Sequence, residues 1–214
     1  MKEIGETIFD IIYLISLLSI SFYIISTYKS KTSRYTGYAL LVLGFGDAFH
    51  LIPRIVSYHL NFNFVSILGI GKLITSITMS VFYIFMYYIY LYNYNERENK
   101  IITYLIWFLL ILRIIFCILP GNNWLDGSST LFYSVLRNIP FIIMGFIIIL
   151  LYFNKRREDK SFRFIWLLIL FSFIFYIPVI ILSSSVKMIG MLMILKTICY
   201  IIVSIMFLLK NNKE

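Results

Sequence analysis

Long apolar stretches, separated by short polar segments, recur along the whole chain. Each stretch is close to or above the roughly 20 residues that an α-helix needs to cross about 30 Å of hydrocarbon. The pattern therefore predicts an all-α, polytopic membrane protein built as a single bundle of seven transmembrane helices. The predicted helices cover approximately residues 5–27, 37–56, 64–92, 101–119, 130–153, 162–182 and 188–209.

Composition agrees with this prediction, because 61% hydrophobic and 14% charged residues leave too little polar surface for a soluble domain of 214 residues. The helices leave no room for a second domain, so residues 1–214 are expected to form one seven-helix domain in the cell membrane. The first stretch is expected to remain as a helix rather than be cleaved as a secretory signal. It has Lys2 beside Glu3 and Glu6, and no small-x-small pattern follows it.

Basic residues outside the apolar stretches concentrate in alternate connections. Twelve of them lie after the first, third and fifth predicted helices and in the C-terminal tail, whereas the other side holds only Lys2 and Lys187. The positive-inside rule then predicts an outside N-terminus and a cytoplasmic C-terminus. The twelve are Lys29, Lys31, Arg34, Arg97, Lys100, Lys155, Arg156, Arg157, Lys160, Arg163, Lys210 and Lys213.

The net charge of +9 is mostly this topological signal, so we expect membrane lipids as partners and no nucleic acid. The cluster Lys155, Arg156 and Arg157 is explained by orientation, or alternatively holds an anionic lipid. Cys117 and Cys199 lie within helices, carry no CxxC spacing, and are typical of small apolar residues.

Apart from Glu6 and Arg163 at helix ends, seven charged residues lie inside the predicted helices, all between the membrane middle and the outer surface. Each would cost on the order of 3 kcal/mol facing lipid at mid-bilayer, so they must face one another, water or a ligand. Five basic against two acidic groups predict an outward-facing, water-filled basic cavity suited to a small anion or a lipid headgroup. Alternatively, Asp10, Arg54 and Arg113 extend to the outer interface and the others pair internally. The seven are Asp10, Asp47, Arg54, Lys72, Arg113, Arg137 and Lys196.

The second predicted helix carries the sharpest motif, in which Asp47, His50 and Arg54 follow i, i+3, i+7 spacing and share one stripe. Pro53 cannot donate to the carbonyl of Phe49, so we expect a bend there and a carbonyl free for water or ligand. Asp47 could orient His50 as a general base, which makes both candidate catalytic residues. In the other interpretation, Asp47 neutralises Lys72 or Lys196 in an interhelical clasp.

Polar faces on the later helices are expected to converge with this stripe. Gly69 and Gly71 allow close helix approach. Ser76 is expected to bond back to its own helix rather than serve as a nucleophile. The candidate ligand-binding residues are Arg54, Lys72, Ser76, Arg113, Tyr133, Arg137, Tyr176, Lys196 and Tyr200.

The chain offers little for metal or cofactor chemistry. His50 and His59 are its two histidines, and basic charge surrounds the first, so no metal site is expected. GxSxG, HExxH and phosphate-cradling glycine motifs are all absent. We therefore expect neither a cofactor nor a nucleotide-driven function.

Several motifs carry resemblances to known families. GFGDAFHLIPR, GIGKLITSITMSVFY, RNIPF and FYIPVIIL together resemble a group of small uncharacterised bacterial seven-helix membrane proteins; the resemblance covers nearly the whole chain and implies no activity. GFGDAFH is also similar to the second-helix GxGSxxFH signature of alkaline ceramidases. The other histidines of that zinc site are missing here, so the comparison extends only to His50.

The topology, Lys196 in the last helix and the segment FYIPVIIL resemble microbial rhodopsins. That resemblance implies retinal bound to Lys196 as a Schiff base. The position one turn earlier, where the family carries an acidic counterion, is Leu192, and the third helix offers Thr75 in place of an acid. Asp47 is then the best candidate to neutralise a protonated Schiff base.

Three classes of function remain. Binding or transport of a small anion fits the surplus positive charge and is preferred by a small margin. A lipid-modifying enzyme of the outer leaflet would use Asp47 and His50 as acid and base, and Lys72, Arg137 and Lys196 to hold a phosphate or carboxylate. A ligand sensor would need an unidentified membrane partner, because the cytoplasmic loops are short. The prolines match no three-plus-three pairing of helices, so inverted-repeat transport gains no support.

Overall fold

The computed structural model describes residues 2–60, 63–182 and 186–212, and over these residues the chain is helical, without strands. Seven α-helices occur in this part of the chain, each long and apolar enough to cross a membrane. Short 3₁₀ helices cover Pro120–Asn122 and Lys187–Met191. The α-helices are α1 (Lys2–Thr27), α2 (Lys31–Ser57), α3 (Val65–Asn93), α4 (Lys100–Ile118), α5 (Leu131–Asn154), α6 (Ile165–Leu182) and α7 (Leu192–Asn211).

The predicted all-α fold with seven membrane-length helices is confirmed, and the largest boundary difference is at α2. This helix begins at Lys31 rather than at about residue 37. Its N-cap is Ser30, whose hydroxyl oxygen accepts a hydrogen bond from the Ser33 amide at 3.0 Å. Thr32 and Ser33 are buried against the bundle, so this polar stretch is a packed first turn rather than a loop.

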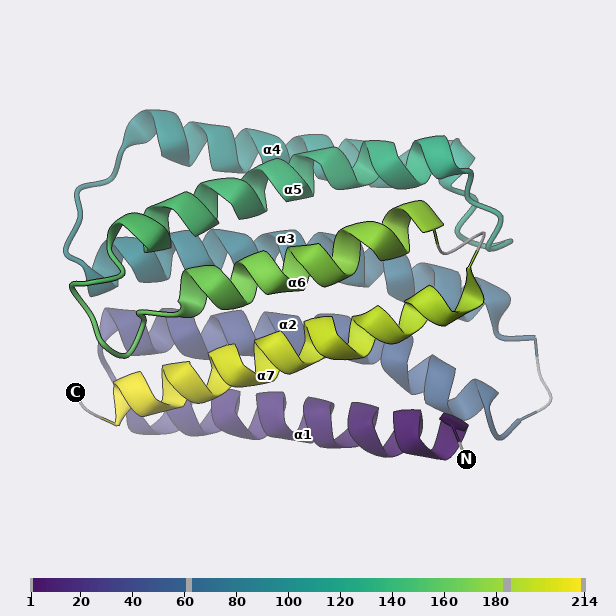
Figure 1. Ribbon diagram of the computed structural model, residues 1–214, viewed down its shortest axis with the longest axis horizontal. Coiled ribbons are helices and arrows are strands. Elements are labelled where there is room, and N and C mark those ends of the chain that lie inside the picture. The colour runs from purple at the N-terminus through teal and green to yellow at the C-terminus, as the bar shows by residue number, and fades with distance from the viewer. Residues whose placement is uncertain (1, 61–62, 183–185, 213–214) are drawn as a thin grey trace.

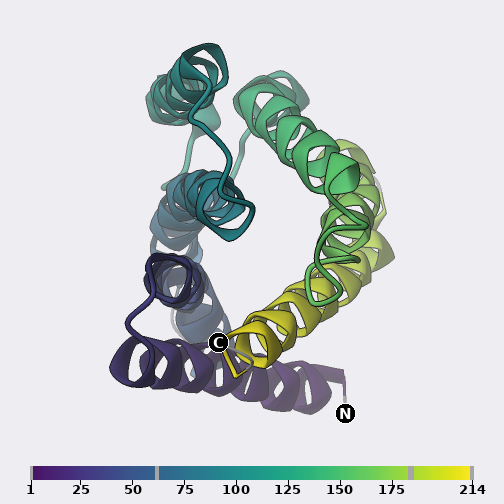
Figure 2. The ribbon, with the colours of Figure 1, turned by 90° about the vertical axis from the view of Figure 1, so that its left-hand side faces the viewer.

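The helices form a ring in which each packs on its chain neighbour and α7 closes on α1. Figure 2 shows this ring end on. α3 also contacts α5, and α2 contacts α7, so side chains fill the ring. α1 begins at one end of the bundle and α7 finishes at the other, as an odd number of passes requires (Figure 1).

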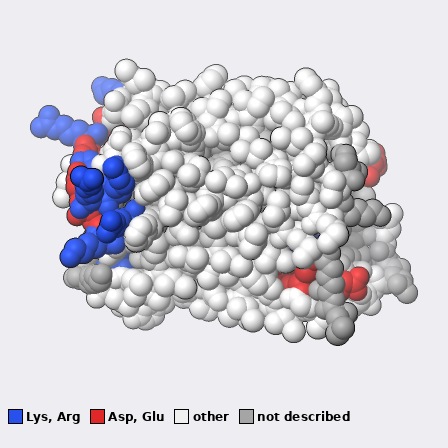
Figure 3. Space-filling model, viewed as in Figure 1, with Lys and Arg blue, Asp and Glu red and all other residues white. Residues whose placement is uncertain are grey.

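Basic side chains gather at the end of the bundle where α1 joins α2, α3 joins α4, α5 joins α6, and α7 finishes; we call it the basic end. In the view of Figure 3, the broad surface between the two ends is free of Lys, Arg, Asp and Glu among the described residues. Large hydrophobic side chains are exposed on each of the seven helices described above, for example Ile15 and Ile101. Such a surface is compatible with contact to lipid on all sides.

Between the basic end and the middle, the interior is packed with aromatic side chains. The hydroxyls of Tyr83 and Tyr200 lie 3.2 Å apart, and the rings of Phe82, Phe141 and Phe173 pack around Tyr83. These five residues, which we call the aromatic layer, are at most 6% exposed. The layer fills the interior of the ring at mid-bundle.

Candidate functional site

One cavity of about 420 Å³ lies at the end opposite the basic end, inside the ring. Helices α2 to α7 all contribute side chains to its wall, and α1 does not. We call it the basic cavity. None of the described residues that line it carries a carboxylate. All five intramembrane cations predicted from the sequence line it: Arg54, Lys72, Arg113, Arg137 and Lys196.

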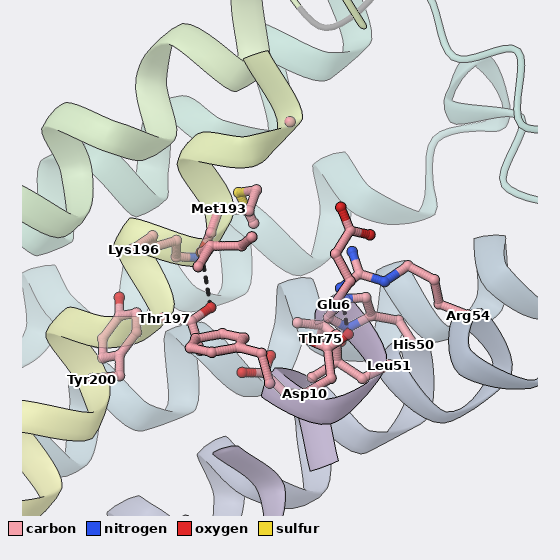
Figure 4. A pocket seen from close by; sticks show the side chains of 14 residues that line it. Glu6, Asp10, His50, Leu51, Arg54, Thr75, Met193, Lys196, Thr197 and Tyr200 are labelled. Carbon is pink, nitrogen blue, oxygen red and sulfur yellow. Dashed lines mark hydrogen bonds and ion pairs between the residues drawn. The ribbon is translucent and has the colours of Figure 1, made fainter. Parts of the chain in front are cut away.

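A second cavity of about 70 Å³ lies beside the first, toward α1, and is called here the side cavity. Its wall carries the carboxylates of Glu6, Asp10 and Asp47. Figure 4 shows it between α1, the His50 and Arg54 side of α2, and the Lys196 side of α7. His50 and Lys196 line both cavities, so they stand on the boundary between the cationic and the acidic space.

Asp10 and Arg54 form the one ion pair that the structure describes at this end of the bundle. The Asp10 Oδ2 and Arg54 Nη2 atoms are 2.6 Å apart, and Asp10 is 4% exposed. Next to them, the Tyr58 hydroxyl donates to Glu6 at 2.8 Å. Burial, together with this bond, raises the pKa of Tyr58 to about 12. Asp10 of α1 therefore balances the charge of Arg54. Among the five cations, Arg54 alone has such an ion pair within the described residues.

Asp47 and His50 take partners from different helices instead of pairing with each other. The Tyr13 hydroxyl of α1 donates to Asp47 Oδ2 at 2.5 Å, whereas His50 Nδ1 lies 3.0 Å from Thr75 Oγ1 of α3. Thr75 Oγ1 also lies 2.7 Å from the Gly46 carbonyl oxygen. The Gly71 carbonyl oxygen is a second acceptor at 2.9 Å, so the Thr75 hydrogen goes to one of these two carbonyls. A neutral His50 therefore donates from Nδ1–H to Thr75 and carries the lone pair on Nε2.

Pro53 of α2 and Gly71 of α3 explain how α3 packs against α2 near His50. α2 continues through Pro53 to Ser57, and in Figure 1 its last turns slope away from the rest of the helix. The predicted free carbonyl of Phe49 is covered, because a Cβ on Gly71 would lie 2.2 Å from its oxygen. The expected close approach of α2 and α3 is therefore present. It covers the Phe49 carbonyl with α3, so this carbonyl is not free for a ligand.

Arg113 is the most deeply buried of the cations, at 1% exposure. Its guanidinium carbon lies 4.0 Å from the ring centroid of Phe141. Neither Nε nor Nη1 has a hydrogen-bond acceptor among the residues that the structure describes. Arg113 therefore does not extend to the outer interface, which was one of the two sequence-based interpretations, and it is a buried charge without an anionic partner.

Arg137 and Lys196 make their direct contacts with neutral groups. Arg137 donates to Asn122 Oδ1 at 2.7 Å and to Ser129 Oγ at 2.9 Å, and stacks 4.4 Å from the Trp124 ring, so the connection between α4 and α5 folds over it. Lys196 Nζ lies 4.4 Å from the Tyr176 ring centroid. Among the described residues, no carboxylate forms an ion pair, within 4.0 Å, with Lys72, Arg113, Arg137 or Lys196. The predicted clasp of Asp47 with Lys72 or Lys196 is thus not formed as a direct ion pair.

The other candidate residues divide between the two cavities. Ser76 lines the basic cavity, and its hydroxyl bonds back to the Lys72 carbonyl at 2.7 Å, as expected. Tyr176 lines the same cavity, whereas Tyr200 lines the side cavity. Tyr133 lines neither, because its ring lies against Gly121 in the connection before α5.

Sequence reasoning missed three participants. Asn138 accepts from the Tyr176 hydroxyl at 2.8 Å and lines the basic cavity; an amide beside Arg137 in an apolar helix was the available signal. Trp124 comes from a loop, where no periodicity identifies a face. Tyr13 contacts Asp47 only because α1 packs beside α2, and nothing local in the sequence encodes that contact.

The residues that the structure describes contain no group of three or more His, Cys, Asp or Glu side chains that could hold a metal ion. No family model, curated protein or solved structure matches the chain. The resemblances drawn from its motifs therefore stay predictions, and the site is interpreted from its own geometry.

Proposed function

We propose that the chain is a single seven-helix domain of a cell membrane, with its N-terminus outside and its C-terminus in the cytoplasm. The gathering of basic residues at one end supports this orientation, because cytoplasmic segments carry an excess of Lys and Arg (Figure 3). With this orientation the basic cavity occupies the outer half of the bundle and faces the outside.

The protein binds a small anionic molecule or a lipid headgroup in the basic cavity. One observation carries this proposal: five cations from five helices line one cavity whose described wall holds no carboxylate. Two like charges about 8 Å apart repel by roughly 2 kcal/mol at an effective dielectric constant near 20. An anion in the cavity replaces this repulsion with attraction, so binding it stabilises the folded protein.

The aromatic layer favours binding over transport. Tyr83, Phe141 and Phe173 pack ring against ring beneath the cavity, and the Tyr152 hydroxyl donates to the Met86 carbonyl nearer the basic end. Transport would require these rings to separate. Anion flux into liposomes that contain the purified protein distinguishes the two: a binding protein leaves the flux at the level of empty liposomes.

The test of binding is thermal unfolding of the purified protein with a panel of anions at constant ionic strength. A ligand at about 100 times its Kd adds roughly 2.7 kcal/mol to the stability. Replacing Lys72, Arg137 or Lys196 with Met should remove this gain while the protein still folds and inserts. Misfolding of all three variants would show that the charges are structural, and the binding proposal would be abandoned.

A second candidate function is an outer-leaflet lipid-modifying enzyme, and the position of His50 favours it. The ring lines both cavities, and Thr75 fixes its Nδ1. His50 Nε2 would then act as the base toward a water in the basic cavity, with Asp47 held apart by Tyr13. Release of headgroup from anionic vesicles, lost in a His50→Gln variant, tests this alternative.

A further inference from the structure

The charge balance of the basic cavity indicates how much negative charge its ligand carries. Asp10 pairs with Arg54, and Asp47 shares the wall of the side cavity with Lys196, although the two form no direct ion pair. Three cations remain without such a partner within the described residues: Lys72 of α3, Arg113 of α4 and Arg137 of α5. A single carboxylate would leave about two of them unmatched, so a ligand with two negative charges fits better.

These cations also act on one another. Lys72, Arg113 and Arg137 come from three helices onto the wall of one cavity, so their like charges repel one another and form a series around it. A ligand that concentrates its charge in one group can reach several members of such a series at once. A phosphate ester carries about 1.5 to 2 negative charges on three strong acceptor oxygens. Two separated carboxylates would each reach fewer cations.

The kinds of side chain support a phosphate as well. Two of the three unmatched cations are arginines, whose planar guanidinium binds phosphate oxygens through parallel hydrogen bonds. Arg113 has two buried nitrogens, Nε and Nη1, for which the described residues supply no acceptor. Arg137 donates to Asn122 and Ser129 through Nη1 alone, and the residue also lines the cavity.

The size and remaining wall of the cavity indicate that the ligand is more than a bare phosphate ion. About 420 Å³ is the space of roughly fourteen water molecules at about 30 Å³ each. It falls in the range of about 300 to 1,000 Å³ that holds organic ligands. Apolar side chains complete the wall, among them Leu68, Met79, Val179, Ile180 and Met193.

We infer that the ligand of the basic cavity is a phosphomonoester, with its phosphate among Lys72, Arg113 and Arg137 and its organic body against the apolar wall. This inference rests on the proposed anion-binding function and narrows it to one chemical class. The same phosphomonoester group occurs in free organic phosphates and in the headgroups of phosphatidate-type lipids, and the two sources differ by an acyl chain.

The experiment is calorimetric titration of the full chain in nanodiscs of zwitterionic lipid at fixed ionic strength. The probes are glycerol 3-phosphate, lysophosphatidic acid, succinate as a dicarboxylate, and glycerol as the neutral control. We expect at least one phosphomonoester to bind with a Kd at least about tenfold below that of succinate. Tighter binding of lysophosphatidic acid identifies a lipid ligand, and equal or tighter binding of glycerol 3-phosphate identifies a free one.

Variants locate the bound phosphate. Arg137→Gln should weaken phosphomonoester binding by at least about tenfold, and Arg137→Lys, which keeps the charge but loses the fork, should weaken it less. Lys72→Gln serves the same purpose on a more exposed side chain if the arginine variant does not fold. Lys160→Gln, an exposed cation at the basic end, is the matched control and should bind as wild type.

Two results would overturn the inference, and they are distinguishable. Succinate binding as tightly as both phosphomonoesters would remove the phosphate assignment while leaving an anion-binding protein. No binding of any anionic probe would contradict both the assignment and the proposed function. Unchanged phosphomonoester affinity in Arg137→Gln and Lys72→Gln would place the ligand outside the basic cavity and likewise refute the inference.

Discussion

At the basic end, Lys155 lies 2.6 Å from Glu96 and 2.8 Å from Glu158, and Lys210 lies 3.1 Å from Asp159. In the basic cavity, by contrast, Arg113 is almost fully buried over a phenylalanine ring, with unmatched nitrogens. Lys155 and Lys210 are paired near water, where pairing contributes little, whereas the buried Arg113, which needs a partner most, has no carboxylate beside it. The difference supports the proposal that the cavity cations bind a negatively charged group that the chain itself does not supply.

The close contact of α2 and α3 at Gly71 should give the largest of these effects. Gly71→Ala would bring a Cβ within 2.2 Å of the Phe49 carbonyl, so the helices must separate around His50 and Thr75. We expect a loss of about 3 kcal/mol or more in unfolding free energy, measured by denaturant titration in micelles. Gly5→Ala is the control, since a Cβ there meets nothing within 4 Å, and equal losses in both variants would contradict this account of the contact.

Removing the carboxylate of Asp10 should increase the excess of positive charge at the cavity end. Asp10→Asn leaves Arg54 without its carboxylate, and we expect a loss of about 2 kcal/mol because Arg54 is only partly buried. The same variant should bind an anionic ligand several-fold more tightly, as Arg54 joins the unmatched cations. Glu3→Gln, exposed on the same helix, is the control for both measurements. A weaker affinity in Asp10→Asn would argue against an electrostatic basis for binding.

Replacing Arg113 is expected to raise the stability of the protein, whereas the two changes above lower it. Arg113→Met replaces an unmatched buried charge with an apolar side chain of similar length, so the ligand-free protein should gain about 1 kcal/mol in stability. Binding of the anion should be lost in the same variant. Arg113→Lys keeps the charge and should show no such gain. A destabilised Arg113→Met protein would mean that this arginine has a structural role.

The smallest effect is expected at the basic end. Burial raises the pKa of Asp159, but hydrogen bonds from Asn93, the Ser161 amide and Lys210 outweigh it, so the pKa lies below its ordinary value of 3.8. A lowered folded-state pKa contributes stability that is present above the unfolded pKa and is lost as the pH falls through the folded one. Asp159→Asn should therefore cost about 1 kcal/mol near pH 6 and nothing at strongly acid pH. Arg157→Gln, exposed at the same end, should cost nothing at either pH.

Much of the fold follows from the sequence because lipid-length apolar stretches leave few alternatives, and the seven helices appear where their spacing predicts them. The convergence of the cations is predictable for a similar reason, since intramembrane charges cannot face lipid. What the sequence does not encode locally is helix rotation and pairing. Tyr133 lies one turn from Arg137 and yet packs on Gly121, and Asp47 finds Tyr13 rather than His50 or a lysine.

The start of α2 shows a second limit of sequence reasoning. Polar residues such as Thr32 and Ser33 are typical of a loop, but here they form a capped and buried first turn. Their burial depends on neighbouring helices of the ring, which hydropathy along a single segment does not report.

The central claim is that the basic cavity is completed by an anion, and native mass spectrometry of the protein released from its membrane tests it most directly. The account predicts a co-purifying anionic lipid or metabolite on the wild-type protein, and its loss in a Lys72→Met, Arg137→Met double variant that still folds. A wild-type protein that carries no such species, and that gains no thermal stability from any anion offered, would contradict it.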